Sequence, residues 1–286
     1  MTLLYEPWLK FKHPIVRQLA FSIASPNILK SLPHDLGVKH HFELHDDQFW
    51  QDHYSRYTDR LVQLDQDPTE LIEFLTPLKS TRLGLRFEHL FWFWLQDAKY
   101  HQYQLLGHSI QIIEGKHTIG ELDFLVRNLE TNCIEHWEVA LKFYLAEVNL
   151  LLPHWYGLNR SDTLLRKLNH FTQKQFQFEQ VLQHEIQKRF AILKGQLYVP
   201  EQINHILHHL NALPNWINSS RRIGQWGNSS LKRYYRVQRQ EWICPNLEQS
   251  SRDATYWQNG LYRNFATQAD YMFRQAQISH SCVRVM

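Results

Sequence analysis

The chain has 286 residues, 43% of them hydrophobic and 14% aromatic, and a formal net charge of +3. This composition supplies a sizeable core and excludes a disordered chain, whereas the charge is too small to indicate a nucleic-acid partner by itself. Three scattered cysteines without a CxxC pair favour a reducing compartment, and no apolar segment is long enough for a signal peptide or a membrane span. We therefore expect a cytoplasmic protein that does not enter a membrane.

Residues 1–79 are predicted to form an N-terminal helical region that prolines divide into short segments. The first helix has apolar residues at helical spacing, namely Val16, Leu19, Ala20 and Ile23. The segment HHFELHDDQFW, residues 40–50, gathers histidines and aspartates. These residue types can hold a metal, but a solvated loop or helix face is the simpler interpretation, and we favour it.

Residues 80–98 are predicted to form a helix that Ser80 or Thr81 caps. Its apolar stripe consists of Phe87, Leu90, Phe91, Trp94 and Leu95. Glu88 lies close to this stripe among aromatic residues, where an unpaired carboxylate is costly to bury. Two interpretations stay open: Glu88 belongs to a functional site, or it lies on the edge of the helix.

Three strands are predicted next, at residues 102–113, 119–128 and 133–146. Turn signals separate them, which indicates an antiparallel meander. Residues 161–186 begin with a Ser-Asp cap and have apolar residues at helical spacing, so they are predicted to form a helix. Residues 190–200 form a further predicted strand. A helix between two strands indicates a crossover connection, and therefore a mixed sheet of the α/β class.

Residues 201–286 are expected to form a C-terminal extension packed on the core, with a short helix at 201–212 and a helical, aromatic-rich tail. The stretch 213–243 holds six Lys and Arg residues against one acid, Glu241. Within it, KRYYRVQRQEW (232–242) interleaves basic and aromatic residues. This pattern is typical of nucleic-acid contact through phosphates and stacked bases, and also of an edge strand with solvated arginines.

Two of the predicted strands carry acids among apolar residues. Glu121 and Asp123 lie in GELDFL, and Glu138 lies in HWEVALK. Residues two apart on a strand share a face, so Glu121 and Asp123 point the same way. If the two strands pair through the turn between them, Asp123 and Glu138 are neighbours. Adjacent carboxylates are typical ligands of a hard divalent ion such as Mg²⁺ or Mn²⁺, which would justify their desolvation.

The order helix, strand, strand, strand, helix, strand, with acids at these places, resembles the PD-(D/E)XK nuclease superfamily. The resemblance covers residues 80–200. In it, Glu88, Asp123 and Glu138 match the acids of the first helix and of the second and third strands. More closely, the chain resembles a bacterial family of proteins that share a domain of unknown function. The motifs of that family cover most of the chain and include RLGLRFEHLFWFWL, GELDFLV, HWEVALKFYL and GLNRSDTLLRKL.

The third strand departs from the superfamily pattern, which is an acid, any residue and a lysine. Ala140 stands two residues after Glu138, and the lysine follows at Lys142. At about 3.3 Å per residue, the Cα of Lys142 is roughly 13 Å from that of Glu138 instead of roughly 6.6 Å. A β-bulge would recover part of this distance, and Lys167 on the next helix is another supplier of the charge. Otherwise, Lys142 is a solvated lysine at the strand end.

The resemblance implies a restriction-endonuclease-like fold and a Mg²⁺- or Mn²⁺-dependent nuclease that acts on DNA or RNA. Asp123 and Glu138 would be metal ligands, and Glu88 a further ligand. Lys142 would be the catalytic lysine. Accessory roles are expected for Glu121, Arg160 and Lys167. The alternative is a nuclease fold that has lost catalysis and serves as a nucleic-acid-binding or scaffolding module, which the displaced lysine favours.

Overall fold

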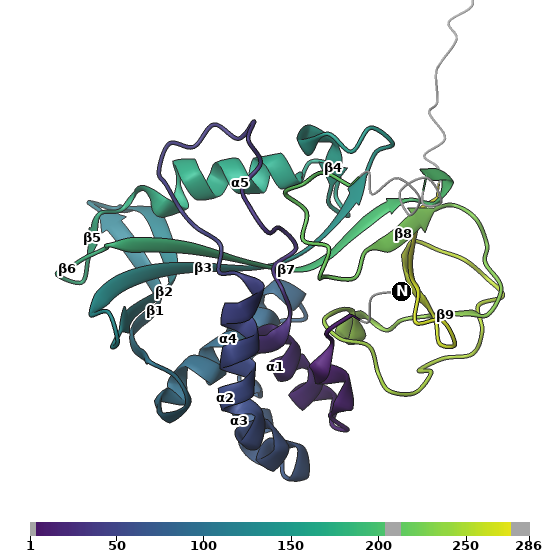
Figure 1. The fold of residues 1–286 in the computed structure, drawn as a ribbon, viewed down its shortest axis with the longest axis horizontal. Coiled ribbons are helices and arrows are strands. Elements are labelled where there is room, and N and C mark those ends of the chain that lie inside the picture. Colours follow the sequence, from purple (N-terminus) through teal and green to yellow (C-terminus); the bar gives the residue numbers. More distant parts are fainter. Residues whose placement is uncertain (1–3, 204–212, 276–286) are drawn as a thin grey trace, which may run out of the picture.

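The computed structural model describes residues 4–203 and 213–275, and one large mixed sheet forms its centre (Figure 1). The sheet has nine strands in the order β1-β2-β3-β7-β8-β11-β10-β9, with β4 paired to β3 beside this path. The strands are β1 (Tyr103–Glu114), β2 (His117–Asn128), β3 (Cys133–Ala146), β4 (Trp155–Tyr156), β7 (Lys188–Pro200), β8 (Gly224–Gly227), β9 (Tyr234–Arg236), β10 (Gly260–Asn264) and β11 (Asp270–Phe273). A separate ribbon consists of β5 (Gln180–Val181) and β6 (His184–Glu185).

Helices cover both faces of this sheet. Those of the described ranges are α1 (Pro14–Ala24), α2 (Asp47–Gln66), α3 (Thr69–Leu75), α4 (Leu83–Gln96) and α5 (Leu164–Gln173). The first four lie together on one face, and α5 crosses the other (Figure 1). Across the same ranges, none of the helices has the length and apolar character needed to span a membrane.

The central strands have the connectivity that the sequence predicts. β1, β2 and β3 form an antiparallel meander, and β7 runs parallel to β3. α5 lies between β3 and β7 in the chain and makes the crossover that a parallel pair requires. The succession α4, β1, β2, β3, α5, β7 is therefore the element order expected for residues 80–200.

β3 is covered on both faces, and this explains its nearly continuous apolar sequence. Trp137, Val139 and Leu141 pack in the hydrophobic cluster formed with α1–α4. Ala140 and Tyr144 point the opposite way and pack in the cluster beneath α5. Glu138, which lies between these residues on β3, is accordingly shielded from water.

α5 is shorter than the sequence predicts, because it ends at Gln173 instead of continuing to residue 186. Its apolar stripe of Leu164, Leu168 and Phe171 would continue at position 175, where the chain has a glutamine. The chain leaves the helix there, makes a short 3-10 turn and enters the β5–β6 ribbon. The helical prediction for the second half of 161–186 was therefore wrong.

The described part of the C-terminal extension forms strands instead of the helical tail that the sequence suggested. It contributes β8, β9, β10 and β11 to the large sheet. β8 runs parallel to β7, and β10 pairs with both β11 and β9. Aromatic residues favour strands because they pack well on a pleated surface, and Tyr262 and Tyr271 lie opposite each other in the β10–β11 ladder. Residues 204–212 and 276–286, which include most of the expected short helix and the end of the tail, lie outside the described residues.

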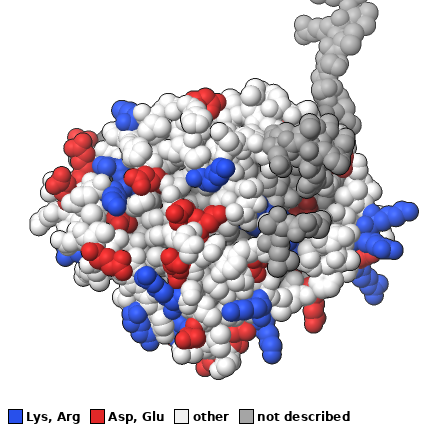
Figure 2. Space-filling view, in the orientation of Figure 1, with Lys and Arg blue, Asp and Glu red and all other residues white. Residues whose placement is uncertain are grey.

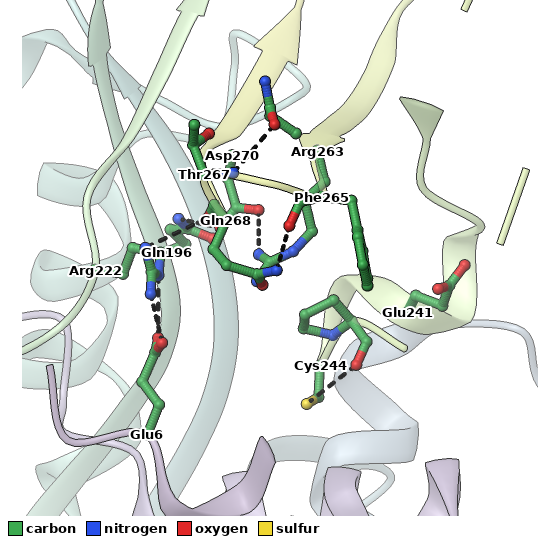
Figure 3. A network of polar contacts seen from close by, with 12 residues as sticks. Glu6, Gln196, Arg222, Glu241, Cys244, Arg263, Phe265, Thr267, Gln268 and Asp270 are labelled. Atoms are coloured by element: carbon green, nitrogen blue, oxygen red, sulfur yellow. Dashed lines mark hydrogen bonds and ion pairs between the residues drawn. The ribbon is translucent and has the colours of Figure 1, made fainter. Parts of the chain in front are cut away.

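A buried polar network ties the N-terminal segment to the C-terminal strands (Figure 3). Glu6 accepts a hydrogen bond of 2.6 Å from Nη2 of Arg222. Asp270 on β11 accepts bonds from Arg263 on β10, at 2.6 Å, and from Gln196 on β7, at 3.0 Å. Because each carboxylate has a cationic partner, the network offsets part of the cost of burying its charges.

Candidate active site

β2 and β3 separate at the position of the predicted acids. Their ladder is regular up to the pair Phe124–Trp137. Beyond it, side chains replace backbone partners: the amide of Asp123 donates to Oε1 of Glu138 at 3.3 Å, and the amide of Val139 donates to Oδ2 of Asp123 at 2.8 Å. The two carboxylates that the sequence predicts to be neighbours therefore lie side by side.

Glu138 is fully buried, and both of its oxygens have partners. Nε2 of His136 lies 2.7 Å from Oε1, and the side-chain amide of Gln175 donates to Oε2. Burial, with a smaller effect of Arg189, lowers the pKa of His136 to about 3, so this imidazole is neutral at physiological pH. Glu138 is thus held in one orientation by neighbours from its own strand and from the segment after α5.

The carboxylate pair binds protons more tightly than ordinary acids. Burial raises the pKa of Glu138 to about 8. Burial and, next, the charges of Glu138 and Glu88 raise the pKa of Asp123 well above its ordinary value. Like charges in a shared desolvated site cannot both ionise without a compensating cation. At neutral pH the pair therefore holds at least one proton unless a cation replaces it.

Lys167 on α5 is a cation whose charge acts on both carboxylates. Its Nζ donates to Oε1 of Gln175 at 3.0 Å, and Gln175 in turn donates to Glu138. The ammonium also lies 3.9 Å from the ring centroid of Phe171. Burial lowers the pKa of Lys167, while Glu138 and Asp123 act in the opposite direction and favour its charged form. α5 thus brings a lysine to the two carboxylates.

Lys142, the lysine assigned to catalysis from the sequence, has a different partner. Its Nζ donates to Oδ2 of Asp162 at 2.8 Å, in an ion pair that is partly exposed. It is four residues from Glu138 along β3, and its side chain reaches the loop before α5 instead of turning back along the strand. Lys142 is therefore engaged by Asp162, and the lysine on which the charges of Glu138 and Asp123 act is Lys167, which the sequence analysis named only as an accessory.

Glu88 reaches the other side of the site from α4. Its Oε1 lies 2.9 Å from Nε2 of His108 and accepts a bond of 3.2 Å from Oγ of Ser109. It is close enough to raise the pKa of Asp123, but it makes no direct hydrogen bond to that residue. Glu88 is therefore a neighbour of the pair and not on an exposed edge of its helix.

His108 and Ser109 were not identified from the sequence. Ser109 has a φ of 48°, which is unusual for a residue with a side chain, and it lies between the ladder pairs His108–Phe124 and Ile110–Leu122. This register places Ser109 across from Asp123. The available signal was the polar Gly-His-Ser break in the apolar run QLLGHSIQII, because a glycine inside a strand often marks an irregularity.

The other predicted accessory residues lie apart from the carboxylates. Glu121 is exposed on β2, opposite Gln111 of β1. Arg160 donates to Oε1 of Glu147 at 3.1 Å, and its guanidinium stacks 4.2 Å from the ring centroid of Tyr156. Glu121 is therefore a solvated acid, and Arg160 belongs to a surface ion pair.

Neither histidine-rich nor arginine-rich stretch joins the site. In 40–50, Asp46 caps α2 by accepting from the amide of Phe49, and His45 is stacked between Phe49 and Phe190. In the basic stretch, β9 is the last strand of the sheet, at the end away from β2. Segment 232–242 therefore contributes an edge strand, β9, as in the second interpretation of its sequence, and it ends in a 3-10 turn at Arg239–Trp242.

The residue types fit a small divalent ion, with water as part of its shell. Among residues 4–203 and 213–275, no three His, Cys, Asp or Glu side chains are grouped as a complete metal cage. Mg²⁺ does not need one, since proteins usually bind it through one or two carboxylates and leave several waters in place. Asp123 and Glu138 are such a pair, and burial is the first cause that raises the pKa of each.

Comparison with known proteins identifies a family but no activity. The sequence model of a family described as a domain of unknown function, DUF1853, matches residues 17–282. Neither a curated protein nor a solved structure matches the chain significantly.

Proposed function

We propose that this chain, which belongs to the DUF1853 family, hydrolyses phosphodiester bonds in nucleic acid with the help of Mg²⁺ or Mn²⁺. The observation that carries the proposal is the meeting of Asp123, Glu138 and Lys167 where β2 and β3 separate. Two desolvated carboxylates and one desolvated lysine are an expensive arrangement to keep in a fold. Such arrangements are concentrated at functional sites.

The order of elements supports the same reaction class. α4, β1, β2, β3, α5 and β7 follow one another as in the PD-(D/E)XK core that the sequence resembles. Glu88, Asp123 and Glu138 stand on the first helix, the second strand and the third strand of this succession. A restriction-endonuclease-like fold is accordingly part of the proposal.

Each residue of the site has a role that its surroundings support. Asp123 and Glu138 would hold the divalent ion, which when bound polarises a phosphate and lowers the pKa of a coordinated water. Lys167 stabilises the negative charge that grows on the phosphate oxygens. His136 and Gln175 fix the orientation of Glu138.

A second candidate is a nucleic-acid-binding or scaffolding protein that has lost catalysis. One observation favours it: both oxygens of Glu138 already accept hydrogen bonds within the protein, Oε1 from the amide of Asp123 and Oε2 from Gln175. A ligand to an ion would have to exchange one of these bonds. The nuclease proposal requires this exchange, and the scaffold proposal does not.

Cleavage of labelled DNA and RNA, measured with Mg²⁺ and with Mn²⁺, separates the two candidates. Wild type should cleave, Glu138→Ala should not, and the control Glu121→Ala should retain activity because Glu121 is exposed. Circular dichroism of all three proteins would show that they are folded. Activity retained by Glu138→Ala would overturn the site assignment. A wild type that binds nucleic acid but cleaves neither substrate with either ion would establish the scaffold.

A further inference from the structure

A groove with a volume of about 650 Å³ runs beside α5 and adjoins the candidate active site. We call it the α5 groove. The charged and titratable residues that line it are Lys142, Asp162, Arg166, Lys167, His170 and Lys174. Lys167 is the link between the two places, because it lines the groove and also interacts with Glu138 and Asp123. A molecule lying in the groove therefore approaches the carboxylate pair.

The groove carries an excess of positive charge. Its one carboxylate, Asp162, is already paired with Lys142 at 2.8 Å. Among the described residues, Arg166, Lys167 and Lys174 have no carboxylate within ion-pair distance. After burial, the next causes that lower the pKa of His170 are the surrounding lysines and Arg166, which is the expected effect of concentrated positive charge.

The arginines of the C-terminal part are arranged differently. Arg222 and Arg263 are paired with Glu6 and Asp270 in the buried network. Arg233 and Arg236 are exposed, but they lie at or beside β9, at the opposite end of the sheet from β2. Figure 2 shows Lys and Arg side chains projecting from the edge of the molecule near β9. A strand bound there would not pass the carboxylate pair.

We propose that the α5 groove binds the phosphate backbone of the nucleic acid and leads it to Asp123 and Glu138. This inference rests on the proposed function, because it assigns a path to the same substrate. α5 has 10 residues and is therefore about 15 Å long, the rise of about four nucleotides at 3.4 Å each. The three unpaired cations match a short stretch of phosphates, and their contacts carry no base preference.

The test is binding without turnover. Anisotropy of a fluorescein-labelled DNA oligonucleotide, single-stranded and as a duplex, is measured in EDTA between about 50 and 200 mM salt. The double variant Arg166→Gln/Lys174→Gln removes two charges of the groove. The double variant Arg233→Gln/Arg236→Gln removes the same charge from exposed positions near β9. Lys167 is left intact in both, so that the carboxylate pair is not disturbed.

The groove variant should bind more weakly, and the slope of log affinity against log salt should be shallower by about 1.4 for single strands or about 1.8 for duplex. The β9 variant should match wild type. Unchanged binding by the groove variant, an equal loss in the β9 variant, or a wild type that binds neither probe would overturn the inference. Failure of the proposed function looks different: groove-dependent binding persists while Mn²⁺ produces no cleavage.

Discussion

The amide of Asp123 donates a hydrogen bond to Oε1 of Glu138 at the point where β2 and β3 cease to pair through their backbones. Each carboxyl group therefore titrates in the presence of the other. Burial desolvates both carboxyl groups, and the cation whose charge acts on them, Lys167, comes from α5. Stability, ion binding and catalysis should consequently respond together to changes at these three residues.

Glu138→Gln should reduce the decrease in the free energy of unfolding that wild type shows as pH rises toward 8. Burial raises the pKa of Glu138 from 4.5 to about 8, so between these values the folded protein holds a proton that the unfolded chain has released. The free energy of unfolding then falls as pH rises, by up to about 1.4 kcal/mol per pH unit. Urea unfolding should show this fall from about pH 6.5 to 8, and Glu138→Gln, which cannot titrate, should show less of it. Identical slopes would contradict the assigned pKa.

The protein should also lose stability in mild acid, through a different group of residues. Burial lowers the pKa of His45, His53, His101 and His136. Their unfolded-state pKa is about 6.5, so the unfolded chain binds more protons below that pH. The stability that they contribute is complete above about pH 6.5 and is lost as pH falls toward the folded-state values.

His45→Phe tests this acid sensitivity with little change of shape. The His45 ring stacks on Phe49 at 3.7 Å and on Phe190 at 3.9 Å, an environment that suits a phenyl ring. The melting temperature of the variant should fall less than that of wild type between about pH 7 and 5. If the melting temperature of the variant falls as much as that of wild type, His45 does not take up a proton when the protein unfolds.

Mn²⁺ should raise the melting temperature of wild type and not that of Asp123→Asn. An ion that binds only the folded state stabilises it by about 2.7 kcal/mol at 100 times its dissociation constant. The variant loses a ligand, and its apo form should be as stable as wild type or more so, since it removes a carboxylate with a raised pKa. Glu121→Gln is the matched control and should respond to Mn²⁺ like wild type. Equal responses in all three proteins would place the ion elsewhere.

Replacing each of the two candidate lysines in turn should show which of them acts in catalysis and which contributes only surface charge. Lys167→Met should slow cleavage by about 10²–10³, the usual cost of removing one donor that stabilises charge in the transition state. Lys142→Met breaks the ion pair with Asp162 and should leave the rate within a small factor of wild type. The opposite result would restore the lysine assignment made from the sequence.

The sequence was most informative where one rule decides the outcome. Strand alternation and turn residues predict the β1–β2–β3 meander, and pairing through the turn then places Asp123 beside Glu138. The parallel β7 follows from the need for a crossover. These inferences depend on neighbours in sequence or on a connection whose geometry is nearly fixed.

It was least informative where the answer depends on packing between distant elements. Lys167 reaches the carboxylates because α5 lies across β3, and the helix pattern does not give that crossing. Gln175 reads as a surface residue, yet it leaves the helix to bind Glu138. Ser109 joins the site through its bond to Glu88, at a backbone position of positive φ that a strand pattern does not predict. The short C-terminal strands extend the sheet from the edge of β7, so their sequences alone do not predict them.

The most direct test of the central claim is anomalous diffraction from crystals soaked in Mn²⁺. The account predicts one strong peak between the carboxylates of Asp123 and Glu138, with metal–oxygen distances of about 2.0–2.5 Å, water completing the shell and Lys167 beside it. An Asp123→Asn crystal treated in the same way should lose this peak. No peak in wild type at saturating Mn²⁺, or a peak bound only by other residues, would contradict a metal-dependent phosphodiesterase at this site.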